Sequence, residues 1–299
     1  MTTPPSVSVV VVNWNSGPWL GRMLESIERH PPSAPYDVVV IDNASSDGSA
    51  APAAARAAVT GSRVRLIRNS RNRGLAAANN QGLAVTAGDR VLICNPDVEL
   101  TAGAVDALSA AMDRHPAAAL AVPRLENLDG SPQTSAGDLP RLSEALLGRR
   151  LSRHLVPGRS RSGPAGFWWD GWDHAEERQI GRGAEACYLV RRAAVAEIGP
   201  QDERFRLDWE GIEWTARLRD RGWQVWLVPE AVVRHAGGAS ISGAGLRWVA
   251  ATHLGTYRYF APRVPLPARV PLALVVTLRG LVKAAAGAAG FPLYRWARP

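Results

Sequence analysis

The chain has 299 residues, 46% of them hydrophobic and 21% charged, and this composition excludes a globally disordered protein. Its length suits one large domain or two closely packed halves. The formal net charge of +8 favours an anionic partner such as a nucleotide, a lipid phosphate or a membrane surface. A nucleic acid also fits the charge taken alone, and an arginine-rich composition is equally typical of a GC-rich genome.

The two cysteines and the apolar segments bear on the compartment. Cys94 and Cys187 each lie in an apolar run without zinc-site spacing, so we expect buried thiols in a reducing compartment. Met1 to Ser6 shows no basic region followed by an apolar stretch, and no signal peptide is predicted. The longest apolar candidate, Pro271 to Leu278, is stopped by Arg279 and falls short of the roughly 18 residues of a spanning helix. We therefore expect a cytoplasmic protein.

Strand and helix patterns alternate along the first part of the chain. The expected strands are Val7 to Val12, Val38 to Ile41, Val64 to Ile67 and Arg90 to Cys94, and the expected helices are Leu20 to Ile27, Ala50 to Val59, Gly74 to Val85 and Thr101 to Met112. This alternation predicts a parallel α/β sheet, whose ligands bind at the carboxyl ends of the strands. Asn13, Asp42 and Asp97 lie at or just past such ends, so we expect them along one edge.

The pattern is lost from Asp138 to Arg182, where Arg, Gly, Pro, Ser and Trp predict loops and short helices. Regular elements then resume, with strands at Ala184 to Val190 and Gln224 to Val228 and helices at Ala193 to Ile198 and Trp214 to Arg221. From Val249 onward the chain is an apolar tail interrupted by Arg and Pro. No internal repeat is visible.

Two polar segments in the first part have the chemistry of a nucleotide site. Asp42, in Val-Ile-Asp-Asn-Ala-Ser-Ser-Asp-Gly-Ser, can accept hydrogen bonds from a ribose or a base edge, or simply start a turn. In the segment from Asn72 to Gly82, Gly74 allows close backbone approach to a ligand and Arg73 can reach a phosphate. An ordinary loop and helix start is the alternative there. Neither segment fits the dinucleotide fingerprint or the P-loop.

Three further segments carry acidic or imidazole groups. Asp97, in Cys-Asn-Pro-Asp-Val-Glu, offers oxygen ligands to Mg²⁺ or Mn²⁺, or belongs to an acidic turn before a helix. The cluster Asp208, Glu210 and Glu213 can supply a general base, or favour the dipole of a helix start. His235, followed by glycines, is either a ligand or a structural histidine.

Taken together and in this order, these segments resemble family 2 glycosyltransferases of the GT-A fold, in the rhamnosyltransferase-like branch. The resemblance runs from about Val7 to Ser240, some four-fifths of the chain. The segment from Asn72 matches the family pattern Asn-x-Gly-Phe-x-x-x-x-Asn-x-Gly except for Leu75 at the Phe position. Gly183-Ala184, Arg191-Arg192 and the stretch from Asp202 to Phe205 look like the part that leads to the acceptor side.

The resemblance implies the roles of individual residues. The donor nucleotide sugar would be held by Asn13, Asn15, Asp42, Asn72, Arg73, Gly74, Asn80 and Asn95. A divalent cation, Mg²⁺ or Mn²⁺, would be held by Asp97 and by His235, which matches the family's late metal-ligand histidine. The donor would be a dTDP- or UDP-sugar and the acceptor a glycan or a lipid-linked glycan, with no nucleic acid bound.

The acidic segment departs from the family pattern. The family usually has Glu-Asp-x-Asp, with the first Asp as base, whereas this chain has Glu210-Gly211-Ile212-Glu213. We favour Glu210 as the base, with Asp208 and Glu213 behind it. Arg217 and Arg219 follow on the predicted helix from Trp214 to Arg221, and they could pair with Glu213 and hold it ionised.

The fold predicted by the resemblance is α/β of the GT-A type, a mostly parallel sheet flanked by helices. A nucleotide-sugar half over about residues 1–120 and an acceptor half over about 121–248 precede a tail over 249–299. The aromatic insert from Phe167 to Trp172 either shapes the acceptor side or forms a small hydrophobic cluster. The tail, basic and apolar from Arg258 to Arg298, resembles an interfacial anchor on the inner face of the membrane, or packs on its own domain or a partner subunit.

The expected function is inverting transfer of a sugar, with rhamnose as one candidate, in the synthesis of a cell-wall or other polysaccharide. Two alternatives remain open. A nucleotidyltransferase shares the general architecture, although the chain has no Gly-rich, Lys-containing N-terminal loop. A non-catalytic nucleotide-sugar binding protein is the sharper alternative because of Gly211.

Overall fold

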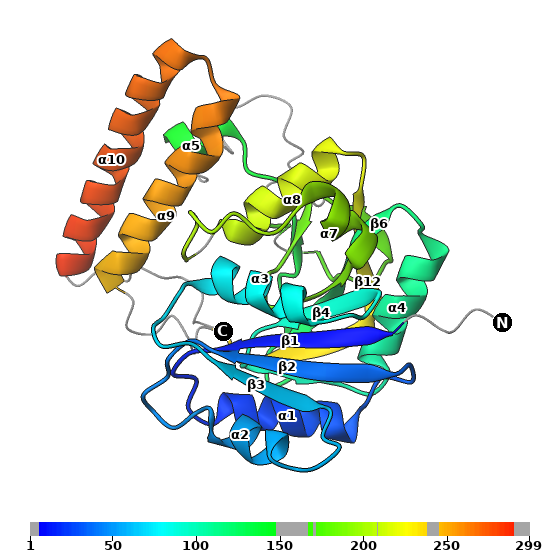
Figure 1. Cartoon of the computed structure of the whole chain (residues 1–299). Helices are drawn as coiled ribbons and strands as arrows, with labels where there is room; N and C mark the ends of the chain where they lie inside the picture. Colours follow the sequence, from blue (N-terminus) through cyan, green and yellow to red (C-terminus); the bar gives the residue numbers. More distant parts are fainter. Residues whose placement is uncertain (1–5, 148–166, 170–171, 208, 238–244, 290–299) are drawn as a thin grey trace.

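A computed structural model describes residues 6–147, 167–169, 172–207, 209–237 and 245–289 (Figure 1). Asp208, part of the Trp-rich insert and the end of the predicted tail lie outside these residues. The strands of the main sheet follow the order β3-β2-β1-β4-β11-β6-β12-β5. The expected α/β fold, with a mostly parallel sheet flanked by helices, is confirmed.

The first four strands of the main sheet are parallel and belong to the half that the sequence analysis assigns to the nucleotide sugar. They are β1 (Val7–Asn13), β2 (Tyr36–Asp42), β3 (Val64–Arg68) and β4 (Arg90–Cys94). All seven residues of β1 are buried, as a run of β-branched side chains covered on both faces requires. Alternate side chains point to opposite faces, so Val9 and Val11 join one hydrophobic cluster and Val10 another.

Helices cover both faces of this half (Figure 1). The helices α1 (Trp19–Arg29), α2 (Ala51–Ala57) and α4 (Ala104–Arg114) share the cluster of Val9 and Val11. Helix α3 (Leu75–Val85) lies on the opposite face, together with α7 (Arg192–Ile198) and α8 (Glu210–Asp220). The apolar spacing that predicted the helices is the spacing that packs them on the sheet.

The second half of the sheet is mixed. Strand β11 (Cys187–Arg191) runs antiparallel to β4 and β6, β12 (Gln224–His235) runs parallel to β6 (Ala118–Glu126), and β5 (Val98–Leu100) returns antiparallel to β12. The sequence analysis missed β6, because its alanines and Pro123 lack the β-branched pattern of a strand. It also ended β12 at Val228, where Pro229 follows and the register with β6 shifts before Val232.

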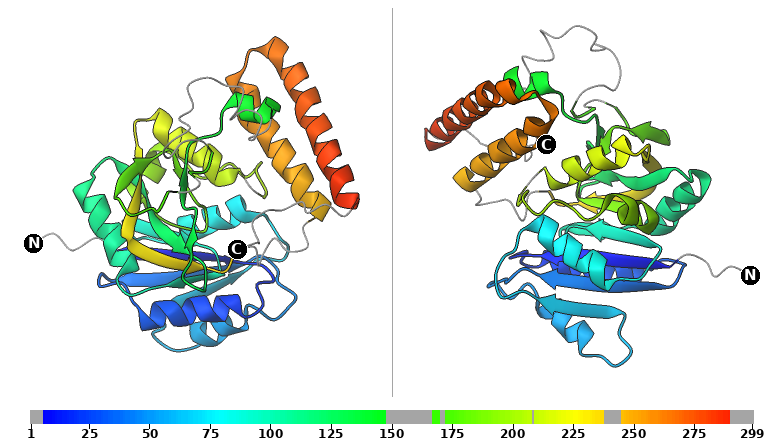
Figure 2. Two further views of the ribbon diagram at one scale, coloured as in Figure 1. Left: turned by 180° about the vertical axis from the view of Figure 1, so that it is seen from behind. Right: turned by 45° about the horizontal axis from the view of Figure 1, so that its top comes forward.

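The region from 138 to 182 contains short elements among its loops. Strand β9 (Arg178–Ile180) pairs with β12, β7 (Pro132–Gln133) pairs with β6, and β8 (Ala136–Gly137) pairs with β10 (Arg182–Gly183). Helix α5 (Leu142–Leu147) lies next to the last helix of the chain (Figure 2).

The predicted tail is a helical hairpin. Helix α9 (Gly245–Phe260), a short 3-10 turn η1 (Ala261–Arg263) and α10 (Leu266–Ala288) place α9 and α10 side by side (Figure 2). Helix α9 crosses the predicted boundary at 249 and packs on Trp209 through Tyr259 and Phe260. The outer helix α10 continues through Arg279, and by length and composition it is the one described helix that could cross a membrane. Arg279 ends the uninterrupted apolar run but not the helix, so the expectation that no segment is long enough to span a membrane is not met by α10.

Candidate functional site

The strand ends of the nucleotide-binding half converge as the sequence predicts. Asn13 and Asp42 are the last residues of β1 and β2 and stand in register. The Asn13 side-chain nitrogen donates to Asp42 Oδ1 at 3.0 Å and to Ser49 Oγ at 3.0 Å, and Ser45 Oγ donates to the same Asp42 oxygen at 2.6 Å. Asn13 is fully buried and holds Asp42 in place, and its predicted contact with the donor stays a prediction.

The loop after β1 is tied to the loop after β2. Asn15 is exposed, has a φ of 47°, and accepts a hydrogen bond from the Ser46 backbone at 2.8 Å through its side-chain oxygen. The Gly17 backbone donates to Asp47 Oδ2 at 2.8 Å. The loops after β1 and β2 therefore form one structured rim beside Asp42.

The Asn72–Gly74 turn borders the same rim. The Asn72 side-chain oxygen accepts from the Gly74 backbone at 2.9 Å, and the Arg73 backbone donates to Asn43 Oδ1 at 3.3 Å while its side chain is exposed. Gly74 has a φ of +90°, and a Cβ there would lie 3.2 Å from the backbone oxygen of Arg206. The close approach that the sequence analysis reserved for a ligand is thus made to another loop.

Asn80 connects the two halves of the protein. Its side-chain nitrogen donates to the Gln201 backbone oxygen at 2.8 Å and to Glu203 Oε1 at 3.1 Å, and its oxygen accepts from the Gln201 backbone at 2.8 Å. Its neighbour Asn79 donates to the Gln201 side chain at 3.1 Å. These contacts give Asn80 a structural task, and its predicted contact with the donor stays a prediction.

Asp97 and His235 meet at the end of the sheet, as the family resemblance implies. Strand β5 pairs antiparallel with β12, which sets His235 opposite Val98, and Asp97 Oδ1 lies 3.4 Å from His235 Nε2. Asp97 is 3% exposed, and this oxygen makes no hydrogen bond among the described residues. A buried carboxylate oxygen without a hydrogen bond is costly unless another group binds it.

The contacts of His235 leave its Nε2 as a ligand atom. The Gln133 side-chain nitrogen donates to Asn127 Oδ1 and to the His235 backbone oxygen, so Gln133 Oε1 is the atom that faces His235 Nδ1 at 3.0 Å. Because Oε1 only accepts, Nδ1 carries a proton, and a ring protonated only there presents a lone pair at Nε2. With that lone pair, Nε2 and the Asp97 oxygen form a donor set that fits a divalent cation. No group of three or more His, Cys, Asp or Glu gathers among the described residues, so substrate oxygens would complete the shell.

Glu210 and Glu213, two members of the expected acidic cluster, have different surroundings in the structure. Glu210 is the first residue of α8 and is 2% exposed, after Trp209 in a left-handed conformation with φ of 80°. Glu213 pairs with Arg217 at 2.9 Å, as anticipated, but burial outweighs this ion pair and raises the pKa of Glu213. Arg219 donates instead to the Gly181 backbone oxygen.

A carboxylate that the sequence analysis overlooked lies against Gly211. Glu185 Oε2 accepts a hydrogen bond from the Gly211 backbone at 3.2 Å. A Cβ at position 211 would lie 2.4 Å from the Glu185 carboxyl carbon. The available signal was a charged residue between Ala184 and Ala186 at the start of a buried strand.

The described part of the Trp-rich insert packs inward. The Arg182 guanidinium lies 3.8 Å from the Phe167 ring centre and 3.7 Å from that of Trp168, and Trp169 is buried in the cluster of Ile180. Among the described residues, the hydrophobic-cluster alternative fits these contacts.

The strand order of the main sheet and the helices on both its faces are those of the GT-A fold, which solved glycosyltransferases share. A family model for glycosyl transferase family 2 matches residues 8–166, and the chain belongs to this family, in its rhamnosyltransferase-like branch. This membership decides against the nucleotidyltransferase alternative.

The chain is similar over most of its length to one characterised relative. It is 33% identical over 292 residues to the N-acetylglucosaminyl-diphospho-decaprenol L-rhamnosyltransferase of Mycobacterium tuberculosis, covering 91% of this chain and 89% of that protein. Among solved structures, GalNAc-T7 with UDP, GalNAc and Mn²⁺ matches with a TM-score of 0.57 and 18% identity, over 77% of this chain and 44% of its own. The Pyrobaculum calidifontis mannosyltransferase PcManGT with GDP-Man and Mn²⁺ matches with a TM-score of 0.56 and 17% identity, over 96% and 76%. The structural likenesses show the fold.

Proposed function

We propose that the protein transfers rhamnose, with inversion, from a dTDP- or UDP-linked donor to a lipid-linked N-acetylglucosamine acceptor. The observation that carries this proposal is the similarity to the mycobacterial rhamnosyltransferase across about nine-tenths of both chains. The reaction would extend a lipid-linked glycan.

The donor would lie along the rim at the strand ends. Asp42 is held by Asn13 in a position to accept from the nucleoside, and the exposed Arg73 can reach the diphosphate. Asn15, Asn72 and Asn95 are proposed as further donor contacts, with Gly74 and Asn80 supporting the loops that carry them. Asp97 Oδ1 and His235 Nε2 would hold Mg²⁺ or Mn²⁺, which would neutralise charge developing on the departing nucleoside diphosphate.

In the reaction, the acceptor oxygen bonds to the anomeric carbon on the face opposite the diphosphate. The bond from that carbon to the phosphate oxygen breaks, and its electron pair leaves with the nucleoside diphosphate. The transition state has oxocarbenium character, by analogy with glycoside hydrolysis. The acceptor proton must pass to a base, and the carboxylates around the start of α8, with Glu210 as the candidate expected from the sequence, are the groups available for it.

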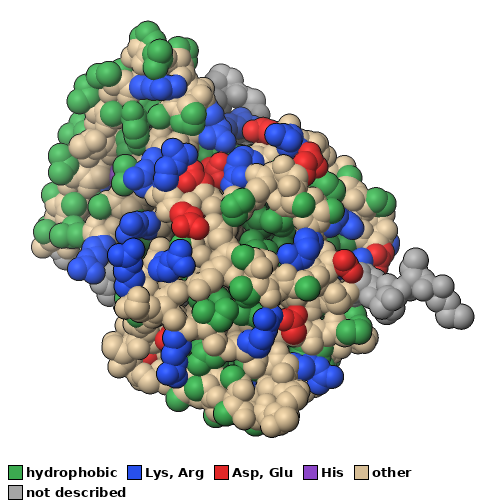
Figure 3. Space-filling model, viewed as in Figure 1, with side chains coloured by type: hydrophobic (Ala, Val, Ile, Leu, Met, Phe, Trp, Pro, Cys, Tyr) green, Lys and Arg blue, Asp and Glu red, His purple; other side chains and the backbone are tan. Residues whose placement is uncertain are grey.

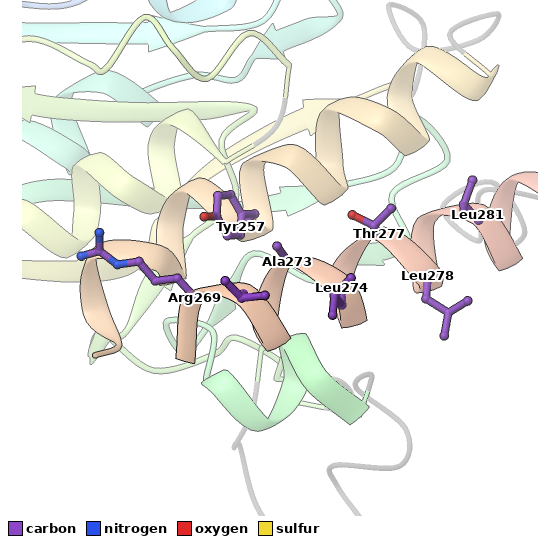
Figure 4. A pocket seen from close by; sticks show the side chains of 8 residues that line it. Tyr257, Arg269, Ala273, Leu274, Thr277, Leu278 and Leu281 are labelled. Atoms are coloured by element: carbon purple, nitrogen blue, oxygen red, sulfur yellow. The ribbon is translucent and has the colours of Figure 1, made fainter. Parts of the chain in front are cut away.

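The acceptor's lipid suggests a membrane location for the helical hairpin. The outer face of α10 exposes Val270, Leu274, Leu278 and Leu281, which with Tyr257 and Arg269 line a shallow groove of about 440 Å³ (Figure 4). Figure 3 shows hydrophobic side chains over this hairpin and basic side chains between it and the nucleotide-binding half. We propose peripheral association with the inner face of the membrane, and a second copy of the chain is the competing occupant.

The metal pair provides the sharpest binding test. Titration calorimetry with a nucleoside diphosphate should show binding that requires Mn²⁺ in the wild type and is lost in Asp97→Asn. The matched control Asp129→Asn alters an exposed loop carboxylate and should bind normally. Equal affinity with Mn²⁺ and with a chelator would show that the metal assignment is wrong.

Transfer itself is tested with dTDP-rhamnose or UDP-rhamnose and an N-acetylglucosaminyl diphospholipid. Mass spectrometry should detect an acceptor enlarged by one deoxyhexose, with the anomeric configuration inverted. Tight donor binding without transfer or donor hydrolysis would instead support the non-catalytic binding protein.

A further inference from the structure

In the first turn of α8, the space beside a glycine is filled by the carboxyl group of Glu185. Gly211 is the second residue of this helix and carries no side chain. A Cβ there would lie 2.4 Å from the carboxyl carbon of Glu185, 2.6 Å from its Oε2 and 2.7 Å from its Cγ. The carboxyl group of Glu185 therefore occupies the volume in which a side chain at position 211 would begin.

The segment that carries Glu185 is hydrogen-bonded to the turn that carries Asp97. It precedes β11, and the Asn95 backbone donates to the backbone oxygen of the next residue, Ala186, at 2.8 Å. Asn95 begins the short turn that delivers Asp97 to the edge of the sheet. The Glu185 carboxyl thus lies against the first turn of α8, on a segment whose backbone is hydrogen-bonded to the turn that carries Asp97.

Exposure separates the two candidate carboxylates. Glu210 is 2% exposed, whereas Glu185 is partly exposed and can be approached by an acceptor hydroxyl. The backbone N–H of Gly211, at the N-terminal end of the helix, donates to Glu185 Oε2 and holds this carboxyl group at the start of α8. Burial, and after it the charge of Glu185, raises the pKa of Tyr188, against the hydrogen bond from Gln201, which lowers it.

We propose that Glu185 is the general base of the transfer and that Gly211 is glycine so that the Glu185 carboxylate can reach the acceptor. This inference rests on the proposed function. As the acceptor oxygen bonds to the anomeric carbon, its proton moves to Glu185, while the carbon–oxygen bond to the diphosphate breaks and the electron pair leaves with the nucleoside diphosphate. Glu210, buried beside this site, is a positioning residue.

The first test compares Glu185→Gln with Glu210→Gln in the full chain. Glutamine at 185 keeps an oxygen that accepts from the Gly211 backbone, so a merely structural cap would survive. We expect Glu185→Gln to lower kcat by roughly 10²–10⁴-fold, with donor affinity and melting temperature near wild type, and to remove the acidic limb of the kcat–pH profile. Glu210→Gln should retain that limb.

The second test moves the carboxylate from position 185 to position 211, on the other side of the contact between Glu185 and Gly211. Gly211→Asp alone should be impaired, because its Cβ overlaps the Glu185 carboxyl. Glu185→Ala alone should be inactive, and the double variant Glu185→Ala/Gly211→Asp should recover at least tenfold over Glu185→Ala.

The outcomes separate the two proposals. Near-normal turnover in Glu185→Gln, with Glu210→Gln inactive, overturns the Glu185 assignment and leaves the glycosyltransferase reaction intact. The absence of any recovery in the double variant, when both proteins are folded, also overturns it. A wild-type protein that binds donor without transfer or hydrolysis overturns the proposed function and this inference together.

Discussion

Gly82→Ala tests how α3 is seated on the sheet. Gly82 is buried on the face of α3 that packs against β1. A Cβ at this position would lie 2.3 Å from Val10 Cγ1 and 3.0 Å from Val10 Cγ2. Carbon atoms in favourable contact lie about 3.5–4.0 Å apart, so the helix or the strand must move by more than about 1 Å.

Two opposing effects set the size of the change. Alanine is favoured over glycine inside a helix by about 1 kcal/mol. Overpacking a buried site costs typically about 1–3 kcal/mol, and the upper part of this range applies because Val10 is fully buried and α3 is tied to Gln201 through Asn80. We expect Gly82→Ala to lower the free energy of unfolding by about 1–2 kcal/mol, with a fall in melting temperature of roughly 2–8 °C.

The assay is urea unfolding followed by circular dichroism, with two matched variants. Gly21→Ala places its Cβ 3.5 Å from Pro52 Cγ, an ordinary contact in α1, and should stabilise by up to about 1 kcal/mol. Val10→Ala removes the clashing methyl groups, so Gly82→Ala should be less harmful in that background by at least about 1 kcal/mol. A Gly82→Ala protein as stable as the wild type, or strict additivity with Val10→Ala, would refute this packing argument.

Two further perturbations test other parts of the molecule. Leu274→Glu with Leu278→Glu should reduce sedimentation with anionic liposomes without changing donor binding, and a wild-type chain that ignores such liposomes at low salt would remove the membrane proposal. Burial raises the pKa of Glu177, but the hydrogen bonds and charges of Arg114 and His115 together lower it by more, so the pKa lies below its usual value. Glu177→Gln should therefore lose about 0.2–1 kcal/mol of stability at pH 7. This difference from the wild type should vanish as the pH falls from about 4.5 through the lowered pKa, because the wild-type carboxylate is then protonated. An unchanged difference at pH 3 would contradict the ion-pair role.

The local hydrophobic pattern was enough to predict the strands that are buried on both faces. The β-branched run of β1 and the apolar stretch of β4 lie within a residue of their predicted ends, because strands buried on both faces are apolar throughout. Strand β6 was missed, since alanines and a proline have no strand signal and only its neighbours β11 and β12 make it one.

The site shows the same division. The resemblance alone indicated Asp97 and His235 as partners, yet the pairing of β5 with β12 is what brings their ligand atoms to 3.4 Å. The sequence marked Glu185 only as a charged residue among apolar ones, and its contact with Gly211 could not be predicted, because a missing side chain matters only when another element fills the space. The sequence by itself determined the class of fold and the strand-end residues through local hydrophobic and turn patterns, and the family resemblance added Asp97 and His235 as a predicted metal pair. Only the tertiary structure showed that the Glu185 carboxyl lies against the start of α8, because this contact depends on how the segment before β11 packs against the helix and not on either segment alone.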